Sequence, residues 1–330
     1  MKSFILLSFL FASLNAQASG WDGYDNPLNM DFDNNYQYNL NQLPMSASLA
    51  VKPWSETYWP ENKGSINIRW NTPDQDGFYY TPYSKDDLSN LTLDQMKTLS
   101  PAEKYDVFMG HYDYPLWNLV RSFSNSRAPE WHGICDGWSI AAIQYPEPQP
   151  VTLPNPDGIL VPFGSSDVKG LMAFVAATEF KVETGQVGVK GGSINPGAMH
   201  VILANQIAVK KQGFVLDKGP KNEIWNQPTY GYDFQAIGSA DSDADHGIQM
   251  HGAVYFTDEL DNSNWNPVVN TPNFKFDKID VDYVLDLDAN NNIVGGSWMR
   301  GSGSPHFFWV PKNHLTFEGD YAGINKIYKH

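Results

Sequence analysis

The sequence predicts an α+β protein in which helices precede an antiparallel sheet. Helix-start signals and proline stops gather between residues 100 and 180, whereas strand-like runs separated by turn residues occupy much of residues 198–298. The one cysteine among the 330 residues, Cys135, begins a predicted helix of the first group. Helices followed by strands, with no internal repeat, are typical of α+β folds rather than of alternating α/β folds.

The first 18 residues have the three parts of a signal peptide. A basic start is followed by an apolar stretch over residues 4–14 and by the small-residue cleavage signal Ala16-Gln17-Ala18. The stretch is too short for a permanent membrane span, and no later window offers the ~18 apolar residues that a span needs. We therefore expect a secreted or periplasmic protein without a membrane anchor.

Residues 19–52 are rich in Asn, Asp, Tyr and Gln and show little periodicity. This predicts an extended or partly disordered lead-in, or a pro-segment. Residues 53–99 form an aromatic-rich N-terminal part of the fold, in which residues 66–70 alternate as a strand would.

The charge of the chain limits its classes of partner. A formal net charge of −15 argues against nucleic acid and against an anionic membrane. The same charge would attract cationic groups such as lysine side chains, or it would simply keep the protein soluble.

Four helices are predicted from their caps and stops. Ser100 caps the first, Pro101 suits its first position and Glu103 can return to the cap, and the helix would end before Gly110. The other three cover residues 115–123, 135–144 and 165–180. The helix from residue 135 stops there because Pro146 cannot continue it.

Beyond residue 180 the pattern changes to strands. Residues 198–207 form an apolar run with few helix caps, and residues 214–217 follow a Gly-containing turn, which together predict a hairpin. Further strands are expected over residues 249–256, 280–287 and 293–298, with residues 288–292 as a turn.

Cys135 lies at the first turn of its helix, where the dipole and the free N–H groups favour a thiolate. The alternative interpretation is a small buried apolar residue, the common role of a lone cysteine. A single cysteine forms no intramolecular disulfide, and a free thiol is a liability in an oxidising compartment. These features favour a catalytic role over simple packing.

A nucleophilic thiol needs a base and a third group that orients the base. His200 begins a strand of the predicted hairpin, and Asp217 ends the partner strand, so the two are expected side by side. The carboxylate would hold one imidazole nitrogen and leave the other to face Cys135. His246 and His251 flank a later strand and are the competing bases.

Residues 133–139 place Gly before the cysteine and an aromatic residue, then a small one, after it, which resembles the nucleophile motif of transglutaminases. More specifically, the chain resembles the transglutaminase elicitor family of oomycetes and its bacterial relatives. The matching stretches keep their order between about residues 53 and 310 and are Pro53-Trp54-Ser55, Tyr58-Trp59-Pro60, residues 100–110, 133–139 and 166–171, Asn195-Pro196-Gly197-Ala198-Met199-His200, Trp225-Asn226-Gln227-Pro228, Gly295-Gly296-Ser297-Trp298 and Phe307-Phe308-Trp309.

The resemblance implies a papain- or transglutaminase-like catalytic domain over residues 100–330, with Cys135, His200 and Asp217 as its triad. It implies protein-glutamine γ-glutamyltransferase chemistry, in which the thiol forms a thioester from peptide-bound Gln and a lysine amine or water resolves it. The partners would be proteins that carry Gln and Lys, and the chemistry needs no cofactor. A cysteine protease or amidase with the same triad, and a secreted elicitor or recognition protein, are the alternatives.

Several residues near the motif are expected to support the reaction. The backbone N–H of Cys135 is a natural oxyanion donor, and by resemblance to animal transglutaminases the indole N–H of Trp131 or Trp117 would be the second. His132 lacks a partnered carboxylate and would be structural or line the substrate site.

Trp225 begins a stretch, residues 225–228, that resembles the start of the surface peptide through which plants recognise the oomycete enzymes. The alternative interpretation is a turn that packs Trp225 near the site, and we favour it.

A weak calcium pattern is present at Asp241, Asp243 and Asp245, whose carboxylates alternate. His246 replaces the Gly that an EF-hand turn requires, and the twelfth position is not Glu. Calcium is therefore a candidate ligand, not a required cofactor.

Overall fold

A computed structural model describes residues 21–71, 77–180, 183–219, 222–242, 244–260 and 274–330 of the chain. The predicted signal peptide, residues 1–18, lies outside the described residues. Among the described residues, no helix has the length and apolar character needed to cross a membrane.

Most of the helices lie in the first half of the chain. Their bounds are Lys85–Ser89 (α1), Leu93–Lys97 (α2), Pro101–Met109 (α3), Pro115–Phe123 (α4), Cys135–Gln144 (α5), Ser165–Thr178 (α6), Pro196–Leu203 (α7) and Ile324–Ile327 (α8). The predicted capping box of α3 is present, because the Ser100 side chain accepts from Glu103 N and the Glu103 carboxylate accepts from Ser100 N. The four helices expected between residues 100 and 180 are thus confirmed.

The strands pair antiparallel throughout the described residues. Their bounds are Ser46–Ser48 (β1), Val151–Pro154 (β2), Leu160–Phe163 (β3), Thr184–Gly188 (β4), Phe214–Asp217 (β5), Asn226–Ala240 (β6), His246–Asp258 (β7), Lys275–Leu287 (β8), Ile293–Trp298 (β9) and Phe307–Pro311 (β10). The main sheet has the order β4-β10-β5-β6-β7-β8-β9, with β1 on β6, and β2 and β3 form a separate hairpin. The α+β class expected from the sequence is confirmed.

Two of the predicted strands are wrong. Residues 198–207 belong to α7 and to a π-helical turn over Ala204–Val209, so β5 pairs with β10 and β6 instead of forming a hairpin with them. The cap is Asn195, whose side chain accepts from the backbone N–H groups of Gly197 and Ala198. Residues 66–70 contain a 3₁₀ turn, Ser65–Asn67, rather than a strand.

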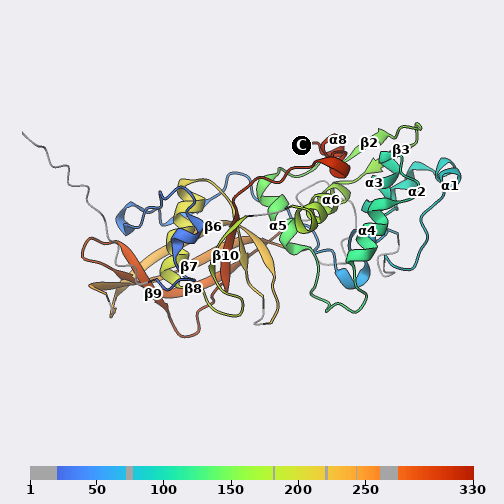
Figure 1. Cartoon of the computed structure of the whole chain (residues 1–330). Coiled ribbons are helices and arrows are strands. Elements are labelled where there is room, and N and C mark those ends of the chain that lie inside the picture. Colours follow the sequence, from blue (N-terminus) through green and yellow to red (C-terminus); the bar gives the residue numbers. More distant parts are fainter. Residues whose placement is uncertain (1–20, 72–76, 181–182, 220–221, 243, 261–273) are drawn as a thin grey trace, which may run out of the picture.

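The molecule is built around two hydrophobic cores that meet at β5 and β10. In Figure 1, α5 and α6 lie on one side of β10, while α7 covers the sheet of β6 to β9 on the other. Val215 and Trp309 belong to the helical core, whereas their strand neighbours Leu216 and Phe308 belong to the core under α7. Because successive side chains of a strand point to opposite faces, these two short strands are buried on both sides.

The lead-in is part of the second core. Met30, Tyr36 and Leu40 are buried against α7 and the sheet, and β1 pairs with β6 from Ser46 to Ser48. Residues 21–49 are therefore packed into the fold rather than disordered, whereas the expectation of a pro-segment stays a prediction.

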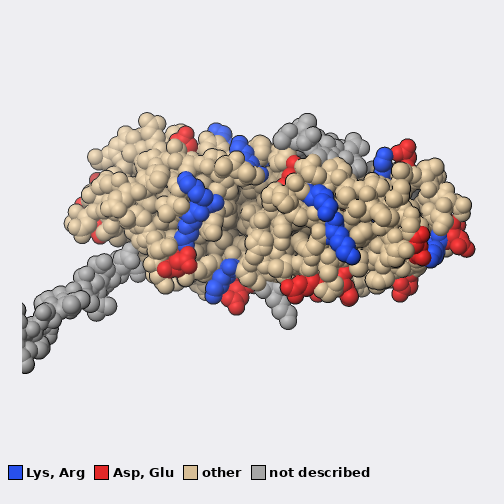
Figure 2. Space-filling model, turned by 90° about the horizontal axis from the view of Figure 1, so that it is seen from above, with Lys and Arg blue, Asp and Glu red and all other residues tan. Residues whose placement is uncertain are grey.

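The excess of acidic residues is spread over the surface. On the face seen in Figure 2, Lys and Arg side chains are interspersed with Asp and Glu on an otherwise uncharged surface. This face therefore carries mixed charge in its described part and does not present one large acidic field.

Candidate active site

Cys135 is the first residue of α5, as the sequence predicts. The preceding residue, Ile134, donates its backbone N–H to the carbonyl oxygen of Tyr58 (2.8 Å) and accepts from Trp138 N (3.0 Å). One turn further on, the Ser139 hydroxyl donates to the Asn226 carbonyl at 2.9 Å. These bonds fix the start of α5 next to the first residue of β6.

The thiol is almost fully buried, with 7% of the residue exposed. Its Sγ lies 3.5 Å from the Asn226 side-chain Nδ2, which donates to it, and 3.9 Å from the Ile224 carbonyl oxygen. Burial, with smaller contributions from the carboxyls of Asp136 and Glu259, raises the pKa of the Cys135 thiol to about 12. At neutral pH the resting site therefore holds a thiol, so a nearby base must remove its proton.

An Asp–His pair stands at the end of β5 and just before β10, the strand that pairs with β5 on the side away from β6. Asp217 ends β5, and its carboxylate Oδ2 accepts from His306 Nδ1 at 2.9 Å. The other oxygen, Oδ1, accepts from Trp225 N at 2.7 Å and Gly219 N at 3.2 Å. Because the carboxylate holds Nδ1 as the donor, it leaves Nε2 of His306 as the basic nitrogen.

Strand register connects this pair to the thiol. Asp217 lies opposite Phe307, the neighbour of His306, on one side and opposite Asn226 on the other. The Trp309 indole donates to Asn226 Oδ1 at 2.9 Å, which turns the amide nitrogen of Asn226 towards Sγ. Strand pairing thus links the Asp217–His306 pair, through Asn226, to the Cys135 thiol at the N-terminus of α5.

The predicted pairing of His200 with Asp217 is wrong. His200 lies in α7, fully buried, with Nδ1 on the Tyr283 hydroxyl at 2.8 Å and its ring stacked on Phe234. Its Nε2 has no hydrogen-bond partner among the described residues. Burial alone lowers the pKa of His200 to about 3. The imidazole is therefore a neutral component of the second core.

The two competing histidines lie on exposed parts of the sheet. His251 pairs with Asp282 at 2.8 Å, and His246 Nε2 lies 3.0 Å from Asn291 Oδ1. Neither contacts Asp217.

The tryptophans expected at the site make other contacts. The Trp117 indole donates to the Tyr80 hydroxyl at 2.8 Å, and the Trp225 indole donates to Glu223 at 2.7 Å. Trp131 packs edge-on against His132, with Lys190 over its ring. His132 itself has Glu61 at 3.7 Å, so it does have a carboxylate neighbour.

Trp225 directly precedes β6, and residues 226–228 begin that strand rather than forming a turn. The Trp225 ring packs edge-on against Tyr58, and Asn226 and Gln227 are buried. The interpretation that this stretch packs near the site therefore fits the structure better than a surface peptide does.

The calcium pattern lies in the connection between β6 and β7. Asp241 and Asp245 flank it, and Asp243 lies outside the described residues. Within the described part of the chain, no group of three or more His, Cys, Asp or Glu side chains is arranged to hold a metal ion. Calcium binding here stays a prediction.

Sequence reasoning missed His306 and Asn226. His306 directly precedes the apolar run Phe307-Phe308-Trp309, and Asn226 follows the Trp225 that the motif comparison singled out. A histidine at the start of a fully buried strand was the available signal.

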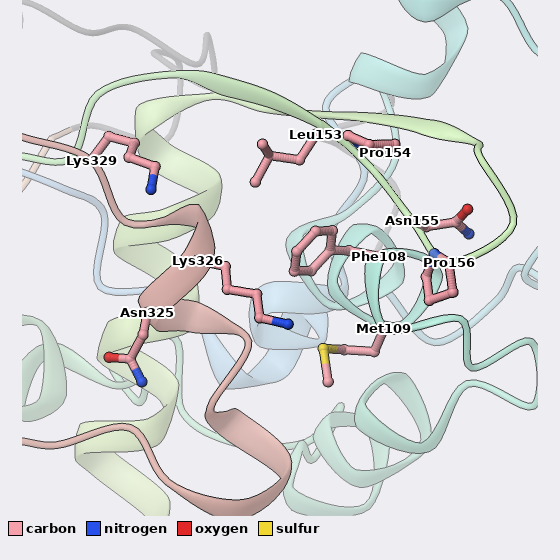
Figure 3. Close-up of a pocket in the computed structure, with 9 residues that line it drawn as sticks. All are labelled: Phe108, Met109, Leu153, Pro154, Asn155, Pro156, Asn325, Lys326 and Lys329. Atoms are coloured by element: carbon pink, nitrogen blue, oxygen red, sulfur yellow. The ribbon is translucent and has the colours of Figure 1, made fainter.

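One cavity of the molecule lies away from Cys135. It measures about 680 Å³ and is open to solvent between the end of α3, the β2–β3 hairpin and the C-terminal residues. Figure 3 shows Phe108 and Met109 at its wall, with Lys326 and Lys329 beside the opening. It includes none of the residues around Cys135.

The chain has the fold of a solved transglutaminase structure. The chain is similar to the crystal structure of the GP42 transglutaminase from Phytophthora sojae, with a TM-score of 0.73 and 20% sequence identity over 94% of this chain and 97% of that chain. Residues 188–257, which include Asp217 and Asn226, match the family model described as transglutaminase elicitor. No curated protein matches the chain in sequence. The resemblance to transglutaminase elicitors is thus confirmed.

Proposed function

We propose that the protein is a cysteine-dependent acyltransferase that acts on protein-bound glutamine and passes the acyl group to a lysine amine or to water. The observation that carries this proposal is the position of Asp217, which holds His306 on one side and lies opposite the Asn226 that contacts the Cys135 thiol on the other. His306 replaces His200 as the base of the triad expected from the sequence.

In the first half-reaction, Cys135 Sγ attacks the carboxamide carbon of glutamine. His306 Nε2 takes the thiol proton and passes it to the leaving ammonia, so a thioester remains. The Asp217 carboxylate stabilises the imidazolium that forms between these two proton transfers. A proton acceptor close to the thiol is needed because burial holds the resting group in its neutral form.

The oxyanion of each step needs two donors. The Cys135 backbone N–H at the start of α5 is one, and we assign the second to Asn226 Nδ2, which already points at Sγ. The Trp309 indole fixes that amide in the donating orientation. In the second half-reaction, an amine or water attacks the thioester and the thiol is restored.

The expected location and partners complete the proposal. The N-terminal sequence favours export to the periplasm or the medium, and the substrates would be proteins that carry Gln and Lys. Neither half-reaction uses a metal ion, and calcium at Asp241 and Asp245 would have another role.

Amine incorporation is the direct test. Purified wild-type protein should release ammonia from a Gln-containing protein and incorporate a labelled primary amine. Cys135→Ala should reduce both to background, and His306→Asn should lower kcat/KM by ~10²–10⁴-fold because proton transfer is lost. Asn226→Ala should lower kcat by ~10²–10³-fold, the usual effect of losing one oxyanion donor.

His251→Asn is a matched control, because His251 also pairs with an aspartate on the same sheet but on an exposed face. It should keep wild-type rates. Cleavage of peptide bonds without amine incorporation would establish the protease alternative, and activity that survives Cys135→Ala would exclude the whole site. Plant responses that persist with Cys135→Ala would support the elicitor alternative.

A further inference from the structure

Asp258 is the last residue of β7 and Glu259 follows it, and the two carboxyl groups have different surroundings. Asp258 accepts from Lys218 at 2.7 Å and pairs with Lys275 at 3.1 Å, so its charge is balanced. Glu259 is the next residue and is 8% exposed, yet its Oε1 has no hydrogen-bond partner and no cation in the described part of the chain. A buried carboxyl without a cation is uncommon and calls for an explanation.

Glu259 lies near the thiol. Thr229 of β6 pairs with Phe256 of β7 in antiparallel register, so the end of β6 that carries Asn226 runs beside the chain that reaches Glu259. The Glu259 carboxyl also contributes to the raised pKa of the Cys135 thiol.

Gln227 adds a second polar group without a partner. Its side chain is fully buried, and neither its Oε1 nor its Nε2 has a hydrogen-bond partner among the described residues. The Gln227 amide is close enough to Glu259 to lower the pKa of that carboxyl, while burial and Asp258 raise it. Unpartnered oxygen acceptors of Glu259 and Gln227 are therefore buried close to Asn226, the residue that contacts Sγ.

These acceptors suit an ammonium group. A lysine ammonium has three N–H donors and no acceptor, so in a buried site it needs oxygen atoms around it. It also brings the positive charge that Glu259 lacks, and an opposite charge nearby favours the carboxylate form. Water as an acceptor requires no such anion.

We propose that Glu259, assisted by Gln227, binds the ammonium of the acceptor lysine and takes its proton, and so decides between amine transfer and hydrolysis. This rests on the proposed function. One ammonium proton moves to Glu259 Oε1, the amine nitrogen bonds to the thioester carbon and the C–S bond breaks. The second proton leaves the nitrogen for Sγ through His306, which yields the isopeptide, the free thiol and a protonated Glu259.

Glu259→Gln tests the assignment, because it removes the charge and keeps the size. We expect ammonia release to stay near the wild-type rate, whereas incorporation of a labelled alkyl diamine falls ~10–100-fold, the loss expected when a charged hydrogen bond is removed. Hydroxylamine, which is uncharged at neutral pH, should still form hydroxamate at the wild-type rate. Glu259→Asp keeps the charge and should recover part of the diamine incorporation.

Glu56→Gln is the matched control, because Glu56 is equally buried but has Lys169 and Thr57 N as neighbours. It should leave the ratio of amine transfer to hydrolysis unchanged. The proposal is overturned if Glu259→Gln keeps the wild-type ratio, or if it reduces diamine and hydroxylamine equally. Loss of all ammonia release with Glu259→Gln, in a protein whose thermal unfolding matches wild type, also overturns it. Failure of the proposed function is a separate result, seen as wild-type protein that releases no ammonia.

Discussion

His306 and His200 differ in what surrounds their ring nitrogens. His306 keeps 15% of its side chain exposed and gives one nitrogen to a carboxylate, which leaves the other for chemistry. His200 is fully buried and faces a tyrosine hydroxyl and an aromatic ring. The burial of His200 lowers its pKa to about 3 and so excludes an imidazolium there.

The burial of His200 predicts a pH dependence of stability. Its folded pKa of about 3 lies below the usual value, so only the unfolded chain takes up this proton as the pH falls from ~6.5 towards ~3. The contribution of neutral His200 to the free energy of unfolding is fully present above pH ~6.5. Below that pH it declines by ~1.4 kcal/mol per pH unit.

Urea unfolding at pH 7.5, 6.0 and 5.0 measures this effect. His200→Gln should be less stable than wild type at pH 7.5, and its stability should depend less steeply on pH. Parallel curves for the two proteins would contradict the assignment.

Individual site residues could be predicted from the sequence when a local signal marked them. Cys135 is the lone thiol at a helix start, and Asp217 ends a clear strand. The partner of Asp217 could not be predicted in this way. His306 reaches Asp217 only because β10 inserts between β4 and β5, and no short pattern encodes a contact between residues 89 positions apart.

At the level of elements, caps and prolines were informative where a helix is amphipathic or sharply bounded. Helix α7 was not predicted because all its residues, from Pro196 to Leu203, are buried. A helix that is apolar all round shows no 3.6-residue period and resembles a buried strand. The pair Asn195-Pro196, an N-cap followed by proline at the first helical position, was the signal for a helix.

The contact between α5 and α6 depends on one glycine. A Cβ at Gly137 would overlap the Ala173 carbonyl oxygen and lie 2.8 Å from Ala177 N, and both are backbone atoms that cannot turn away. Gly137→Ala should therefore separate the helices, destabilise the fold by ~1–3 kcal/mol and lower Tm by ~3–10 °C. It should also reduce activity, because Cys135 is two residues away.

Gly238→Ala controls for this substitution, since a Cβ at Gly238 meets nothing within 4 Å. Its Tm should stay close to that of wild type in the same calorimetric scan. An unchanged Tm for Gly137→Ala would mean that the two helices pack less closely than described.

At the scale of the whole molecule, the class and the order of helices before sheet followed from the sequence, but the division into two cores did not. The shared strands β5 and β10 look like ordinary short apolar runs, and their double burial appears only when both cores are assembled (Figure 1). The aromatic residues of the lead-in looked like loop composition because they serve a core formed more than a hundred residues later.

Removal of residues 21–49 should therefore unfold the second core, which lies between α7 and the main sheet. Met30, Tyr36, Tyr38, Leu40 and Leu43 are all buried there. At ~1.5–3 kcal/mol for each side chain, they contribute about as much as the ~5–15 kcal/mol of a typical net stability. A chain beginning at residue 50 should lose its cooperative thermal transition, whereas one beginning at residue 21 should keep it. Retention of full activity by the shorter chain would show that the segment is dispensable.

The place of His306 just before β10 also matters while the protein is being made. A ribosome completes residue 135 long before residue 306, and β10, which directly follows His306, enters the sheet between β4 and β5 as its last strand. Such long-range pairing forms late in folding. A partly synthesised chain would therefore carry Cys135 without the Asp217–His306 pair, and the acyl transfer that we propose would begin only when translation is almost finished.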